Sequence, residues 1–190
     1  MIRSREDFRD FLKADRSANL MEGVNWLRYL IKLFLGSEKA HVWRYIKTLR
    51  CCEYHMNNSG VWHRILYGLY RCKLHRLGFS YGFRVPPNVC GKGLMLYHLA
   101  PGGCLVNAER VGENCHLQTG VVLGAAEGKN KGNPTIGDNV SFGPGAVVLG
   151  KVTVGDNVFV AANAVVITDV PPNCLAAGIP AKPVKFFGNK

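Results

Sequence analysis

His98 is the residue whose type and surroundings most directly suggest chemistry. It ends the segment GKGLMLYH (91–98) and precedes LAPGGC (99–104), a glycine-rich stretch typical of a chain corner. A neutral imidazole accepts a proton from a hydroxyl group near neutral pH, so His98 is a candidate general base. An ordinary surface histidine fits the same local sequence, so the elements that carry His98 must decide between the two interpretations.

Two other polar residues could take part in such a site. His116 lies between Cys115 and Leu117 and is a rival base, although its spacing predicts an outward-facing wall residue. Glu109 falls where the repeat described below favours an apolar residue, so either the chain bulges there or the carboxylate faces a functional neighbour. In the second case Glu109, or a backbone carbonyl, would orient the second ring nitrogen of His98. Neither histidine has a His or Asp companion at metal-ligand spacing, and we expect no metal site.

A six-residue repeat organises the second half of the chain. Large apolar residues recur at every sixth position, and a second small or apolar residue follows each of them four places later. These positions are Ile136, Phe142, Val148, Val154, Val160 and Val166, followed by Val140, Ala146, Val152, Val158, Ala164 and Val170. A period of six fits a short strand and a tight corner, three of which close a coil of about 18 residues. The sequence therefore predicts a mainly β fold, a parallel β-helix.

Two interruptions of this repeat mark where a site could lie. The repeat begins weakly at Val85 and breaks at 99–104. It then resumes in steps of six at Leu105, Val111, Leu117 and Leu123. The segment 125–135 (AAEGKNKGNPT) is polar and rich in glycine, so we expect a loop extruded from the coils. Long loops on a rigid scaffold often border functional sites.

The residues before the repeat show helical spacing of apolar side chains. We expect helices over about 4–16, 25–35, from Ser37 onward and over 61–78, the last ended by Gly78. These helices predict a cap over the open end of the coils. Their aromatic and basic faces also fit contact with a membrane surface, which stays open as the alternative.

Charge is concentrated in the first part of the chain. The formal net charge is +11, and residues 1–80 carry 15 Lys/Arg against 7 Asp/Glu, whereas the rest carries 9 against 6. This imbalance predicts either an acidic partner or a solvated basic face. No stacking platform or groove-reading motif accompanies the charge, so we expect no nucleic-acid partner.

Cysteine usage and the amino-terminal segment bear on the compartment. The seven cysteines show no C-x-x-C spacing, which argues against a zinc ribbon and a disulfide framework. The segment MIRSREDFRDFLKADR is charged throughout, unlike a signal peptide, and no apolar run reaches the roughly 18 residues of a membrane span. We expect a cytoplasmic location, with the inner face of the membrane as the alternative.

Three segments resemble the hexapeptide-repeat acyltransferases, which include polysaccharide O-acetyltransferases, and most closely their serine O-acetyltransferase branch. They are VPPNVCGKGLMLYH (85–98), VVLGAAEGKNKGNPTIGDNV (121–140) and VPPNCLAAGIPAKPVK (170–185). The resemblance implies a helical region over 1–78, a left-handed β-helix over 79–175 and a tail over 176–190 that lines a coenzyme A site. It also implies a homotrimer with active sites between subunits, or a hexamer joined through the N-terminal helices.

The resemblance also implies acetyl-CoA-dependent O-acetyl transfer, with His98 in the place of the general base. Three positions depart from the serine pattern. The acidic residue before the histidine is Tyr97, the Asp one coil earlier falls at about Phe83, and the Arg-His pair of the loop is Gly132-Asn133. We therefore expect a sugar hydroxyl of a capsule, lipopolysaccharide or related polysaccharide precursor as acceptor, contacted by Tyr97 and Asn133. The alternatives are serine, as in cysteine biosynthesis, and a non-catalytic scaffold that binds an acidic partner.

Acetyl-CoA itself would bind along the groove between coils. The resemblance places its pantetheine arm against corner amides such as those of Ala125 and Ala162. A proline precedes Gly145 at another corner and has no N–H group, so Gly145 is expected to donate there. Lys182 and Lys185 suit the phosphates of the coenzyme, although solubility of the tail explains Lys185 equally well.

Overall fold

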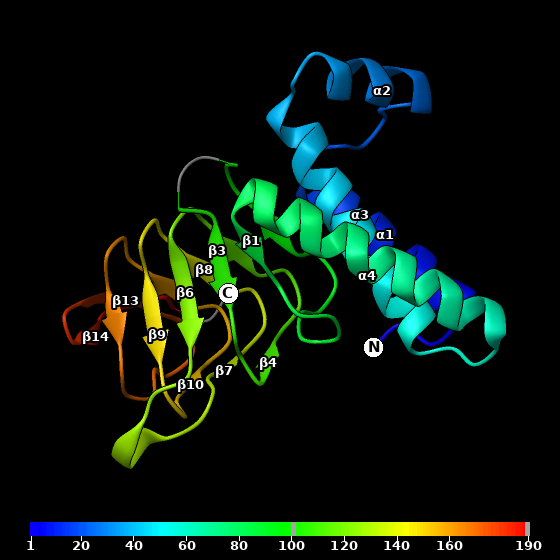
Figure 1. Ribbon diagram of the computed structural model, residues 1–190. Coiled ribbons are helices and arrows are strands. Elements are labelled where there is room, and N and C mark those ends of the chain that lie inside the picture. Colours follow the sequence, from blue (N-terminus) through cyan, green and yellow to red (C-terminus); the bar gives the residue numbers. More distant parts are fainter. Residues whose placement is uncertain (100–101, 189–190) are drawn as a thin grey trace.

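The computed structural model of the protein describes residues 1–99 and 102–188, with helices first and strands after them (Figure 1). The α-helices are α1 (Arg5–Ala18), α2 (Trp26–Phe34), α3 (Glu38–Met56) and α4 (Val61–Tyr81). The strands are β1 (Phe83–Arg84), β2 (Met95–Leu96), β3 (Cys104–Val106), β4 (Arg110–Val111), β5 (His116–Leu117), β6 (Val121–Gly124), β7 (Thr135–Ile136), β8 (Ser141–Phe142), β9 (Val147–Leu149), β10 (Thr153–Val154), β11 (Phe159–Val160), β12 (Val165–Val166), β13 (Cys174–Gly178) and β14 (Ala181–Phe186). The 3-10 helix η1 (Gly128–Asn130) lies between β6 and β7.

The helices begin where the sequence predicts. At α1 the Ser4 hydroxyl accepts the N–H of Asp7 at 3.0 Å, and the Asp7 carboxylate accepts the N–H of Ser4 at 2.9 Å. This reciprocal capping box satisfies donors that the first turn would otherwise leave open. Asn25 caps α2 by accepting the N–H of Arg28 at 2.9 Å.

The end of α4 corrects the expectation that Gly78 terminates it. The helix continues to Tyr81, and Gly82 stops it in the left-handed region at φ +73°. A Cβ atom at Gly78 would lie 2.5 Å from the carbonyl oxygen of Phe83. Glycine is therefore needed at 78 for close approach of the first strand, and at 82 for the backbone conformation.

The strands form three sheets that the chain visits in turn. The sheet orders are β1-β3-β6-β9-β12, β4-β7-β10 and β2-β5-β8-β11-β13-β14, and all neighbours are parallel except β13 and β14. Strand β7 pairs with β10 through Ile136 and Val154, and β8 pairs with β11 through Phe142 and Val160. Every third strand thus returns to the same sheet, as the six-residue period predicts.

The repeat positions face one common core. All twelve side chains of the repeat between residues 136 and 170 are at most 3% exposed. Cys115, expected to act as a small apolar residue, is fully buried, and burial raises the pKa of its thiol to about 11. Burial of each large side chain contributes about 1.5–3 kcal/mol relative to exposure. The predicted core is therefore confirmed.

The repeat is out of register on β3. Leu105 was expected in the core, but Cys104 and Val106 are buried on either side of it and Leu105 is only half-buried. Further along, Ala108 is buried and Glu109 is exposed. The buried Val106 and Val111 are five residues apart instead of six, so the register shifts by one residue at the corner between β3 and β4. The out-of-pattern position of Glu109 follows from this shift.

A buried ionic network joins the helices to the first coil. Arg50 of α3 is fully buried, and its Nε lies 2.7 Å from Asp15 Oδ2 of α1. Its Nη1 donates to Glu53 Oε2 at 2.9 Å, and further N–H groups donate to the carbonyl oxygens of Cys90 and Gly91 at 2.9 and 2.6 Å. Burial alone lowers the pKa of Arg50, but the charges of Glu53 and Asp15 raise it by more, so the guanidinium stays charged.

The two carboxylates of this network also bind the backbone of the first coil. Asp15 accepts the N–H of Leu94 at 2.9 Å, and Glu53 accepts the N–H of Asn88 at 2.9 Å. Asn19, which caps the end of α1, donates to the carbonyl oxygen of Leu94 at 2.8 Å. These bonds fix α1 and α3 against the segment that leads into β2.

Arg50→Ala should destabilise the protein by about 3–5 kcal/mol, because it leaves two buried carboxylates without their cation. Urea unfolding followed by circular dichroism measures this. Arg44→Ala on the exposed side of the same helix is the matched control and should change stability by less than about 0.5 kcal/mol. Equal effects of the two substitutions would show that the network is unimportant for stability.

Candidate active site

His98 lies two residues beyond the end of β2, in a conformation that non-glycine residues rarely adopt. Its φ is +54°, in the left-handed region, and its side chain is 59% exposed. Such a backbone persists when surrounding contacts hold it, and it is found often at functional sites. The expected corner 99–104 falls in part on residues 100–101, which lie outside the described residues.

Glu38, the first residue of α3, holds both the ring and the backbone of this corner. Its Oε1 lies 3.2 Å from Nδ1 of His98 and accepts the N–H of Leu99 at 2.7 Å. A carboxylate only accepts hydrogen bonds, so the neutral imidazole carries its proton on Nδ1 and leaves the lone pair of Nε2 available. This is the state that a general base requires.

Glu109, predicted as one orienting partner, lies elsewhere in the described chain. Its side chain is exposed, and its backbone N–H donates to the carbonyl oxygen of Pro134 at 2.9 Å. The carboxylate that contacts His98 is that of Glu38, from a helix 60 residues earlier. No local spacing in the sequence could indicate this partner.

A small cavity of about 70 Å³ lies at this contact, between the helices and β2. It is lined by Asn19, Leu20, Glu38, Lys39, Val42, Met95, Leu96 and His98. Its walls come from the end of α1, the first turns of α3 and β2, the elements that the buried network holds together. His98 is therefore positioned by the helical region as well as by the coil that carries it.

His116 and Tyr97 lie on the outer face of the same sheet. His116 pairs with Met95 across β5 and β2, is half-buried, and has a pKa lowered by that burial. The Tyr97 ring centroid is 6.1 Å from that of His98 and 6.3 Å from that of His116. His116 is thus a wall residue of the sheet, as the sequence predicted.

The extruded loop projects from the coils, as Figure 1 shows for the segment between β6 and β7. It is tied to later coils, because Asn130 Nδ2 donates to the carbonyl oxygen of Ile167 at 2.9 Å and its own carbonyl accepts the N–H of Lys151 at 3.0 Å. In the described chain, no hydrogen bond or ring contact joins Asn133 of this loop to Tyr97 or His98. These residues are not brought together within one copy.

The residues predicted to bind coenzyme A differ in whether their backbone N–H groups are already hydrogen-bonded. The N–H groups of Ala125 and Ala162 have no hydrogen-bond partner within the described residues, and both residues are exposed. The N–H of Gly145 donates to the carbonyl oxygen of Thr119 at 2.9 Å and is therefore already engaged. Two of the three predicted amide donors thus remain available.

The C-terminal lysines lie on a strand. Gly178, at φ +103°, turns the chain so that β14 runs antiparallel to β13. Lys182 pairs with Ala177 and Lys185 with Leu175, and both lysines are exposed. The part of the tail that the structure describes, up to residue 188, is therefore a fixed cationic edge of the last coil.

No group of three or more His, Cys, Asp or Glu side chains within the described ranges is placed to hold a metal ion.

Two family models match the repeat region. Residues 133–168 match bacterial transferase hexapeptide (six repeats), and residues 110–125 match the hexapeptide repeat of succinyl-transferase.

Relatives and solved structures extend the match to the helices. The serine acetyltransferase of Staphylococcus xylosus is 34% identical over 155 residues, which are 75% of this chain and 71% of that protein. The chain belongs to the hexapeptide-repeat transferases, in their serine acetyltransferase-like branch. The serine acetyltransferase of Synechococcus elongatus is 34% identical over 139 residues, 67% of this chain and 56% of that protein. The structure of Neisseria gonorrhoeae serine acetyltransferase in complex with serine aligns with a TM-score of 0.66 at 28% identity, covering 96% of this chain and 71% of that one.

The chain spans about half the length of the first curated relatives it matches, 56% and 46%.

These comparisons overturn the predicted polysaccharide acceptor. The relatives and structural neighbours are serine acetyltransferases, so the expectation of a glycan hydroxyl is wrong. That expectation rested on three departures: Tyr97 and about Phe83 in place of acidic residues, and Gly132-Asn133 in place of an Arg-His pair. The structure shows a carboxylate brought to His98 from Glu38 instead. A motif comparison along the strands does not detect a group supplied by a helix.

Proposed function

We propose that this protein is a serine O-acetyltransferase that uses acetyl-CoA. The observation that carries the proposal is the Glu38–His98 pair, a histidine whose Nδ1 is held by a carboxylate and whose Nε2 has no hydrogen-bond partner among the described residues. Its side chains are 44% and 59% exposed, so a substrate can reach them. The family supports the reaction type, and the serine bound to the gonococcal neighbour supports the acceptor.

In this proposal His98 Nε2 accepts the proton of the serine hydroxyl as the oxygen attacks the acetyl carbonyl, and later returns it to the leaving thiol. Glu38 stabilises the imidazolium that forms in between. Acetyl-CoA supplies the activated acetyl group. Backbone N–H groups at a coil corner suit the negative charge that develops on the carbonyl oxygen.

The serine itself needs a partner for its carboxylate. The extruded loop carries an exposed cation, Lys131, two residues before Asn133. A Lys ammonium and an amide can bind a carboxylate, although less specifically than a bidentate Arg. We assign these two residues, with Tyr97 near the base, to serine binding.

The chain fits acetyl-CoA at the positions with open donors. The free N–H groups of Ala125 and Ala162 suit the carbonyl oxygens of the pantetheine arm. Lys182 and Lys185 suit the phosphates of the coenzyme. The engaged N–H of Gly145 takes no part.

We further propose that the coils wind in the left-handed sense and that three copies associate. Within the described residues no hydrogen bond joins Asn133 to His98, so we infer that a loop from a second copy completes the site. The half-buried outer face around Val147 and Val165, together with Ala161 at the preceding corner, offers apolar area for such an interface.

The acceptor is tested by measuring release of coenzyme A from acetyl-CoA with purified protein. We expect L-serine to support release at least about tenfold faster than a panel of free and nucleotide-activated sugars, since only serine offers a carboxylate to the loop cation. A faster rate with a sugar would contradict the proposed acceptor, and no release with any acceptor would favour a non-catalytic scaffold.

His98→Ala should lower kcat for serine about 10²–10⁴-fold, the range that a general base contributes. Binding of coenzyme A, measured by calorimetry, should change little, because its contacts come from other coils. His116→Ala is the matched control and should keep most of the activity. An active His98→Ala protein beside an inactive, folded His116→Ala protein would move the base to the other histidine.

Analytical ultracentrifugation should show a trimer, or a multiple of three copies, at micromolar concentration. A monomeric protein that still acetylates serine would contradict an active site shared between two copies.

A further inference from the structure

Helix α2 turns an apolar stripe towards solvent. Leu27, Leu30, Ile31 and Phe34 follow the i, i+3, i+4, i+7 spacing of one helix face, and they are 61%, 39%, 48% and 90% exposed. Amphipathic helices of globular proteins normally turn such a stripe to the core. In Figure 1 α2 lies apart from the other helices, at the end of the helical region away from the amino terminus.

The stripe is accompanied by positive charge. Arg28 and Lys32 lie one turn apart on α2, and the helix has no acidic residue. An apolar face flanked by basic residues is typical of helices that lie in the interface of an anionic membrane.

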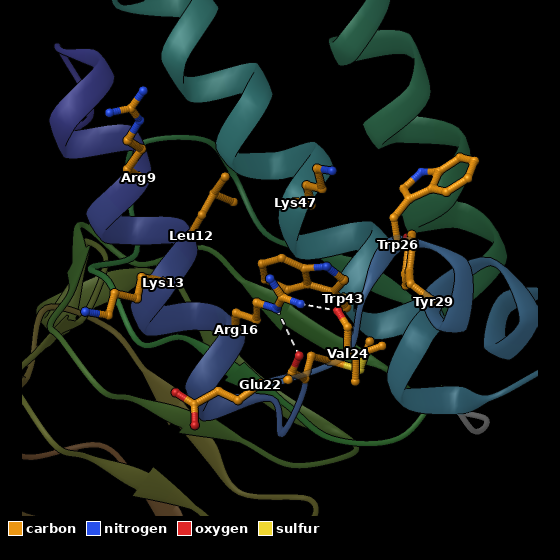
Figure 2. Close-up of a pocket in the computed structure, with 12 residues that line it drawn as sticks. Arg9, Leu12, Lys13, Arg16, Glu22, Val24, Trp26, Tyr29, Trp43 and Lys47 are labelled. Atoms are coloured by element: carbon orange, nitrogen blue, oxygen red, sulfur yellow. Dashed lines mark hydrogen bonds between the residues drawn. The ribbon is translucent and has the colours of Figure 1, made fainter.

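A cavity of about 640 Å³ beside α2 is also basic (Figure 2). The cations that line it are Arg9, Lys13, Arg16 and Lys47, with Glu22 as the acidic residue among them. Trp26 and Tyr29 of α2 form part of the same wall, so the apolar helix and the basic cavity adjoin. Tryptophan and tyrosine are enriched at membrane interfaces, where one end of the side chain is apolar and the other hydrated.

Arg16 sets the position of α2 relative to this cavity. Its Nε donates to the carbonyl oxygen of Met21 at 2.9 Å, and its Nη2 donates to that of Val24. Met21 is buried, so the segment that leads into α2 is anchored to the core. The exposed stripe is therefore held outward by fixed contacts.

Charge decides between the occupants that could cover this face. A second copy that paired its own α2 with this one would bring the same Arg28, Lys32 and cavity cations against each other, and like charges oppose such pairing. An anionic lipid surface complements all of them and accepts the apolar stripe as well. None of the helices in the described residues is long and apolar enough to cross a membrane.

We propose that α2 docks the protein onto anionic membrane surfaces, with the stripe among the acyl chains and the adjoining basic cavity against phosphate headgroups. The proposal is independent of the acetyl-transfer reaction, because none of these residues lies at His98.

Co-sedimentation of the purified full chain with lipid vesicles tests this. We expect binding to phosphatidylcholine vesicles containing about one third phosphatidylglycerol to be at least about tenfold tighter than to phosphatidylcholine alone, and to weaken at high salt. Phe34→Asp and Ile31→Asp should each weaken that binding about tenfold or more. Lys13→Glu should reduce the preference for anionic vesicles.

Phe159→Asp is the matched control, because Phe159 is 40% exposed on β11, in the coils and outside the helices. It should bind vesicles like wild type, and circular dichroism confirms that each variant is folded. Absence of vesicle binding, equal affinity for neutral and anionic vesicles, or an equal loss in Phe159→Asp would overturn the proposal. If wild type does not bind vesicles and Phe34→Asp dissociates an oligomer of the protein, the stripe contacts a second copy instead of a membrane.

Discussion

The buried guanidinium of Arg50 is the constraint on which the candidate site depends. A fully buried arginine is unfavourable unless its charge and its N–H groups are all matched. Two carboxylates from α1 and α3 and two backbone carbonyls from the first coil meet this requirement together. Separating the helical region from the coils would expose these charges to solvent or leave them buried and unpaired. The relative position of the two regions is therefore fixed.

That fixed position has a chemical consequence at the other end of α3. Glu38 opens the helix whose middle carries Arg50, and it meets His98 just beyond the coil to which Arg50 is bound. The carboxylate selects the ring tautomer and holds a left-handed backbone in place through Leu99. A histidine at a corner is thus oriented by a second structural element, which is the kind of support that the proposed general base requires.

The sequence predicted what depends on local pattern. The repeat between Ile136 and Val170 predicted the core because its period is set by strand and corner geometry, and Ser4 and Asp7 predicted the start of α1. It failed where tertiary contact decides. Gly78 was predicted to end the helix, but its lack of a side chain instead allows close packing against Phe83. Leu105 follows the period but lies before a corner that shifts the register. The sequence did not reveal Glu38 as the partner of His98, because 60 residues separate the two. The wrong prediction of a glycan acceptor rested in part on this missing carboxylate.

The proposed mechanism depends on Glu38, which holds the neutral His98 ring with its proton on Nδ1. Nitrogen-15 NMR of the imidazole measures this directly, because protonated and unprotonated ring nitrogens have well separated shifts. In wild-type protein at mildly alkaline pH, we expect the protonated signal from Nδ1 and the unprotonated signal from Nε2. Glu38→Gln should abolish this preference, and the same change at the exposed Glu6 should not. A wild-type ring protonated on Nε2, or one unaffected by Glu38→Gln, would contradict the account.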